Sequence, residues 1–98
     1  MAFVQIIEIE TNRADEIEEL VREWRAKTAG TRTALRGMLT RDRDRPNTYL
    51  QIVEFPSYED AMANSKLPAT AELSQKISAL SEGPLVFRNF DVESVEEM

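Results

Sequence analysis

The sequence predicts an α+β fold with the element order β-α-β-β-α-β, in which four strands form one antiparallel sheet. The main observation is an internal repeat: Phe3 to Ile9 reads FVQIIEI, and Tyr49 to Phe55 reads YLQIVEF, 46 residues later. Each copy is a short β-branched and aromatic run followed by a helix-start signal, which indicates two β-α halves. A length of 98 residues suits one hydrophobic core, so residues 1–98 are expected to form a single domain.

Composition limits the classes of function. The net charge is −6, which argues against a nucleic-acid partner because phosphate neutralisation needs clustered Lys and Arg. The one basic stretch, Arg32 to Arg45, is interpreted as part of a sheet edge. The first apolar run is too short and too polar for a signal-peptide core or a membrane span, so we expect a soluble cytoplasmic protein with no membrane partner. The chain has neither Cys nor His, which removes thiolate, iron–sulfur and imidazole chemistry. We expect no metal and no cofactor.

The first strand and helix form the first β-α half. Phe3 to Ile9 carries apolar residues on both faces, so this strand is expected to be covered on both sides. Thr11 and Asn12 supply oxygens suited to capping the helix that follows, about Arg13 to Ala29. Trp24 lies on the apolar stripe of that helix; we interpret it as a core anchor and keep a pocket residue as the alternative.

The middle of the chain predicts a hairpin. A less apolar strand, about Thr33 to Arg43, precedes the turn residues Pro46 and Asn47. The alternating charges from Arg41 to Arg45 indicate a solvated, protected sheet edge rather than a binding site, because charge along an edge strand blocks strand addition.

The second half opens with the repeat strand and a helix start at Ser57. Pro68 interrupts the apolar stripe of this helix, so we expect a break between Asn64 and Pro68. The break is either a helix in two pieces or the edge of a pocket lined by Asn64, Ser65 and Lys66. The last strand is expected from Leu85 to Val92, before an acidic tail.

This order of elements is the ferredoxin-like split β-α-β arrangement. We expect the two repeat strands to be central and parallel, with Gln5 and Gln51 on one face and Glu8 and Glu54 on the other. Two helices cover one face only. Leaving the apolar side chains of the other face in water forgoes on the order of 5 to 10 kcal/mol, so we expect a homodimer through that open face.

Four segments resemble the dimeric α+β barrel superfamily, which includes the antibiotic biosynthesis monooxygenases and the stress-responsive A/B barrel proteins. They read TYLQIVEF, SYEDA, NSKLP and GPLVFRNFDV, and the resemblance covers Phe3 to Val92. It is strongest to small bacterial members. It implies this barrel fold and, among the activities of the superfamily, cofactor-free oxygenation of aromatics or haem degradation. The haem-degrading pattern needs a His ligand, which this chain lacks.

The sequence leaves two functions open, and with them the question of whether the protein is an enzyme. We favour a non-catalytic dimeric module that binds a small molecule, such as a small aromatic ligand, or a protein partner. The alternative is a cofactor-independent monooxygenase acting on quinol- or anthrone-like aromatics. For Gln5 and Gln51 a structural alternative is a paired-amide ladder between strands. The candidate pocket residues are Trp24, Arg36, Tyr49, Gln51, Asn64 and Arg88.

Overall fold

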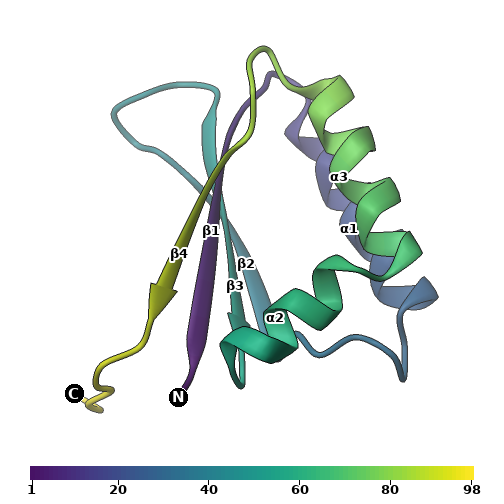
Figure 1. Cartoon of the computed structure of the whole chain (residues 1–98). Helices are drawn as coiled ribbons and strands as arrows, with labels where there is room; N and C mark the ends of the chain where they lie inside the picture. Colours follow the sequence, from purple (N-terminus) through teal and green to yellow (C-terminus); the bar gives the residue numbers. More distant parts are fainter.

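The computed structural model describes residues 1–98 and has two layers, a sheet on one side and the helices on the other (Figure 1). The elements are β1 (Phe3–Glu10), α1 (Ala14–Lys27), β2 (Arg36–Arg41), β3 (Thr48–Phe55), α2 (Tyr58–Ser65), α3 (Pro68–Leu80) and β4 (Val86–Asp91). The predicted α+β fold class is confirmed, with the second helical region divided in two. No helix is long and apolar enough to cross a membrane.

The sheet has the order β2-β3-β1-β4, so both repeat strands are central, as predicted. The expectation that they run parallel is wrong, because β1 and β3 pair antiparallel. The reason is the connection: α1 returns the chain so that β2 runs in the direction of β1, and the hairpin then reverses β3. Phe3 pairs with Phe55, so odd-numbered residues of both strands share a face. Gln5 and Gln51 therefore lie together on the helix side.

The start of α1 differs from the predicted cap. The helix begins after Arg13, which makes no side-chain capping bond. Thr11 is fully buried and instead joins the two halves of the fold, since its Oγ1 accepts from the Arg13 N–H at 3.0 Å and donates to the Leu80 carbonyl at 2.7 Å. Beyond the helix, Gly30 adopts a positive φ of 85°, which a glycine tolerates without strain.

The break in the second helical region is confirmed. The helix α2 starts at its N-cap Ser57, whose Oγ accepts a 3.1 Å hydrogen bond from the Asp60 N–H. It ends at Ser65, and Pro68 is the first residue of α3. Proline suits a first helical position because it has no N–H to donate. In Figure 1, α2 consequently runs across the end of the sheet while α3 turns to lie beside α1.

The hydrophobic core is divided into two separate clusters. One contains Phe3, Phe55 and Ala61, and the other contains Ile9, Ile17 and Ile77. Between them lie four helix-facing side chains of the central strands that keep partial contact with solvent: Gln5, Ile7, Gln51 and Val53. Phe3 and Ile9, at the two ends of the helix-facing row of β1, are only 3% and 0% exposed. The middle of this row is therefore less buried than its two ends.

The other face of the sheet is open. Three large apolar side chains on it are close to half exposed: Met38 at 46%, Val86 at 42% and Phe90 at 46%. No helix covers this face (Figure 1). The expected apolar open face is therefore present.

Candidate functional site

Gln51 lies in the middle of β3 with its side chain on the helix side of the sheet. Its amide makes no hydrogen bond within the protein, and the residue is only partly buried. The side chain extends toward Gly37 on the neighbouring edge strand, where a Cβ atom would lie 3.0 Å from Nε2 of Gln51. The amide is thus a free polar group in the space between the layers.

Gln5, in contrast, is hydrogen-bonded to a residue of β4, the edge strand on the other side of the sheet from β2. Its Nε2 donates a 3.1 Å hydrogen bond to Oδ1 of Asn89, its register partner on β4. The paired-amide ladder between Gln5 and Gln51 is not formed, because Gln5 stands opposite Val53 on β3. Asn89 was not among the predicted site residues; its alternation with Phe87 indicated a shared face, but its partner depended on the strand register.

Asn64 faces the sheet from α2. It lies three residues after Ala61, on the same side of the helix, and Ala61 packs against Phe3 and Phe55. Asn64 is 6% exposed, and its Oδ1 is buried without a hydrogen-bond partner. A buried carbonyl oxygen without a donor is rare in folded proteins and calls for an explanation such as a bound water, an ion or a functional role.

Tyr49 completes the set on the helix side. It is the register partner of Ile9 and packs at the margin of the second core cluster. Tyr49, Gln51 and Asn64 therefore all face the space between sheet and helices. They bring a phenol and two amides to the helix side of the sheet, where Tyr49 and Gln51 are partly exposed and Asn64 is buried.

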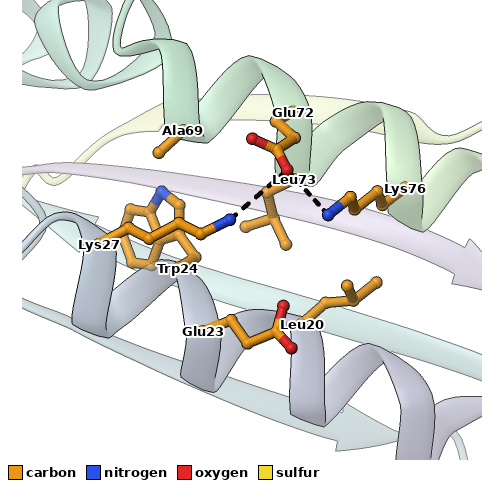
Figure 2. A pocket seen from close by; sticks show the side chains of 8 residues that line it. All are labelled: Leu20, Glu23, Trp24, Lys27, Ala69, Glu72, Leu73 and Lys76. Atoms are coloured by element: carbon orange, nitrogen blue, oxygen red, sulfur yellow. Dashed lines mark hydrogen bonds and ion pairs between the residues drawn. The ribbon is translucent and has the colours of Figure 1, made fainter.

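Trp24 takes another position, between α1 and α3. Its indole Nε1 donates a 2.9 Å hydrogen bond to Oγ1 of Thr70, and its ring forms part of a narrow groove between the two helices (Figure 2). Lys27 of α1 pairs with Glu72 across this groove, and Lys76 pairs with Glu72 along α3. The groove encloses about 10 Å³, room for about one water molecule. Trp24 therefore lies beside a space too small for an organic ligand.

Arg36 and Arg88 lie on the open face of the sheet. Arg36 Nε pairs with Glu54 at 3.0 Å, and Arg88 Nη2 pairs with Oε1 of Glu8 at 3.2 Å. The sheet separates both guanidinium groups from Gln51 and the other helix-facing residues. The six candidate residues therefore do not form one cluster in a single protomer: three lie between the layers, two on the open face and one between helices.

Solved structures show the same arrangement of elements. A mutant of SnoaB, a cofactor-independent oxygenase from Streptomyces nogalater, aligns over 96% of this chain and 95% of its own with a TM-score of 0.79 and 18% identity. An antibiotic biosynthesis monooxygenase aligns over 96% and 100%, with a TM-score of 0.72 and 21% identity. A Caulobacter crescentus protein described as a candidate monooxygenase of this kind aligns over 95% and 91%, with a TM-score of 0.79 and 14% identity. The chain shares the fold of these proteins. No protein-family model and no curated protein sequence matches it.

The shifted pKa values belong to exposed ion pairs and not to the helix-facing centre of the sheet. A hydrogen bond from Lys76 lowers the pKa of Glu72, and the backbone N–H of Asp44 lowers the pKa of Asp42 in the hairpin turn. No three acidic side chains are grouped so that they could hold a metal ion. The helix-facing side of the sheet thus offers neutral amide donors and acceptors with one phenol.

Proposed function

We propose that the protein is a cofactor-independent monooxygenase that binds an electron-rich quinol- or anthrone-like aromatic between the sheet and the helices. The observation that carries the proposal is the buried, unpartnered Oδ1 of Asn64. Leaving such an acceptor unpaired costs about 1–3 kcal/mol. A ligand hydroxyl that donates a hydrogen bond to this oxygen removes the cost, so binding of a hydroxylated ligand is favoured.

The surrounding groups suit this chemistry. An anthrone that loses a ring CH2 proton becomes an anion with charge on its oxygen, and the free amide N–H of Gln51 is available to stabilise that oxygen. The substrate anion then reduces dioxygen. The CH2 carbon loses two hydrogens, one oxygen atom enters it as a carbonyl, and the other leaves as water, so the substrate supplies all the electrons.

The comparisons support the proposal at the level of fold. SnoaB is a cofactor-independent oxygenase, and it shares the arrangement of strands and helices over 96% of this chain. A sheet and helix layer of this shape is therefore able to support oxygenation without a cofactor. The residues that would do so here are those of this chain: Tyr49, Gln51 and Asn64.

A second candidate function is ligand binding without chemistry. The observation that favours it is the neutral character of the helix-facing centre, where Gln5, Gln51, Asn64 and Asn89 are amides. An amide neither accepts nor releases a proton near neutral pH, so no strong base is placed there. Such a lining is sufficient to hold a neutral aromatic molecule and leaves proton removal to Tyr49 or to water.

We also propose that the working form is a homodimer joined through the open faces of two sheets. Burying a large apolar side chain stabilises by about 1.5–3 kcal/mol, and Met38, Val86 and Phe90 are available for such burial. The charges on the same face already pair within the protomer, as in Arg36 with Glu54 and Arg88 with Glu8. Contact between two copies would therefore bury paired charges, which costs less than burying isolated ones.

Oxygen consumption tests the catalytic proposal. The purified protein is supplied with a panel of quinols and anthrones, and the rate above autoxidation is measured with an oxygen electrode. We expect uptake with at least one substrate and a loss of about tenfold in kcat/KM for Asn64→Ala, the worth of one hydrogen bond from the substrate hydroxyl. Asn12→Ala changes an exposed asparagine before α1 and should leave the rate unchanged. Binding of a panel member without oxygen uptake would support the second candidate, and absence of both would exclude the two.

A further inference from the structure

We propose that Gly37 is a specificity-determining residue that acts by positioning the amide of Gln51. The inference rests on the proposed function, since it assigns a role within the same ligand site. Because Gly37 has no side chain, the Gln51 amide can lie over the edge strand β2 and not over the centre of the sheet, where the proposed ligand would bind. Gly37 itself does not need to touch the ligand.

The first argument is geometric. Gly37 and Gln51 both face the helices, since Gly37 pairs with Val53 and Leu39 pairs with Gln51. The Gln51 side chain leans diagonally along the strand pair toward Gly37. A Cβ atom at that position would lie 3.0 Å from Nε2 and 3.7 Å from the Ile52 carbonyl oxygen, so the amide occupies space that any other residue would fill.

The second argument is energetic. Glycine in a strand interior lowers stability by about 0.5–1 kcal/mol relative to alanine, and often marks a place where another group comes close. Gly30 has a positive φ, which explains its glycine by backbone conformation. Gly37 has no positive φ, so the presence of a glycine at this position is explained by the close approach of the Gln51 amide.

The consequence of adding a methyl group follows from these distances. The atom that must yield is the end of a flexible side chain, so the strand pairing should remain and only the Gln51 amide should move away from β2. A displaced amide narrows the space above the centre of the sheet. A three-ring anthrone should be affected more than a one-ring quinol, which needs less of that space.

Binding measurements without oxygen test this. A dihydroxyanthrone and a one-ring quinol are titrated into the wild type, Gly37→Ala, Gln51→Ala and the double variant. We expect Gly37→Ala to weaken anthrone binding about fivefold, the worth of one hydrogen bond, and quinol binding less than twofold. In the Gln51→Ala background, Gly37→Ala should have no further effect, because the group that it displaces is absent.

Gly83 provides the matched control. No atom lies within 4 Å of a Cβ added there and its φ is not positive, so Gly83→Ala should bind as the wild type does. The proposal is overturned if Gly37→Ala binds both ligands as tightly as the wild type does. It is also overturned if the loss of anthrone affinity caused by Gly37→Ala adds fully to the loss caused by Gln51→Ala in the double variant. It also falls if the wild type binds no panel member.

A measurement without ligand distinguishes failure of the positioning role of Gly37 from failure of the proposed function. In proton–nitrogen correlation spectra, the side-chain amide signals of Gln51 are assigned by their loss in Gln51→Ala. Gly37→Ala should shift these signals, whereas Gly83→Ala should not. Unshifted signals would overturn the positioning role whatever the ligand. Shifted signals without any ligand binding would retain the contact and refute the proposed function, and with it the role in specificity.

Discussion

The indole nitrogen of Trp24 donates a 2.9 Å hydrogen bond to Oγ1 of Thr70, which follows it by 46 residues. The repeated strands are related by the same offset, and this bond connects the helix of the first β-α half to α3 in the second half. Trp24 thereby connects α1 to α3; it is half-buried and belongs to neither core cluster. Thr70→Val should lower the free energy of unfolding by about 1 kcal/mol, because it leaves the indole N–H without a partner.

Denaturant unfolding measures this effect, and Thr70→Ser is the control because it keeps the hydroxyl. The double variant Trp24→Phe/Thr70→Val should lose no more free energy of unfolding through this hydrogen bond than Trp24→Phe alone, because either change removes the same bond. Full additivity of the two changes would show that the bond contributes nothing to stability.

Asn64→Leu should separate stability from binding. The change replaces a buried, unpartnered amide oxygen by an apolar group of similar size, so the ligand-free protein should be as stable as the wild type or more stable, by up to about 1–3 kcal/mol. The same change removes the acceptor for the ligand hydroxyl, so ligand-dependent stabilisation should disappear. Thermal unfolding with and without a dihydroxyanthrone, in the absence of oxygen, measures both quantities.

Asn12→Leu is the comparison at an exposed asparagine and should keep the ligand response. A clear fall in Tm for ligand-free Asn64→Leu would contradict the prediction. It would show that the Asn64 side chain stabilises the helix break in the ligand-free protein and is not an unpaired acceptor for a ligand.

Phe90→Glu should dissociate the expected dimer. Phe90 is 46% exposed on the open face, and a carboxylate at the centre of an apolar contact would be buried without a partner. Light scattering should give twice the 11.2 kDa chain mass for the wild type at micromolar concentration and the single mass for the variant. Val95→Glu adds the same charge at an 81% exposed position and should stay dimeric. A wild-type particle of one chain mass would refute the dimer.

The sequence predicted what depends on local chemistry. The alternation of the repeat placed Gln5 and Gln51 on one face, and Pro68 placed the helix break, because proline alters its own helical turn directly. The direction of the central strands depended on the hairpin between the halves, and here the prediction failed.

The composition of the site was harder to predict because it depends on two non-local facts. The alternation of side chains along β2 placed Arg36 and Gly37 on opposite faces of the sheet. Which of these faces the helices cover depends on how the helices pack, and the sequence pattern does not show it. The pairing of Gln5 with Asn89 and the approach of Gln51 to Gly37 follow from strand register. A shift of one residue would have placed each of these side chains on the other face.

The ion pairs of Glu72 should make stability depend on pH. Lys76 Nζ lies 2.8 Å from Oε1 of Glu72, and Lys27 Nζ lies 3.5 Å from the same atom (Figure 2). The hydrogen bond from Lys76, followed by the charge of Lys27, lowers the pKa of Glu72 below its ordinary value of 4.5. A carboxyl group whose pKa is lower in the folded state stabilises that state fully above its unfolded pKa. The contribution is lost as the pH falls through the folded pKa.

Glu72→Gln should therefore have a lower Tm than the wild type at neutral pH, and the difference should shrink as the pH falls below 4.5. Added salt should reduce the difference as well, because all three side chains are about half exposed and exposed pairs are screened. Glu19→Gln removes a carboxylate of α1 that has no ion pair in the structure, and its Tm should follow that of the wild type. A Tm difference for Glu72→Gln that persists unchanged in acid would show that the side chain acts by packing against α1 and not by its charge.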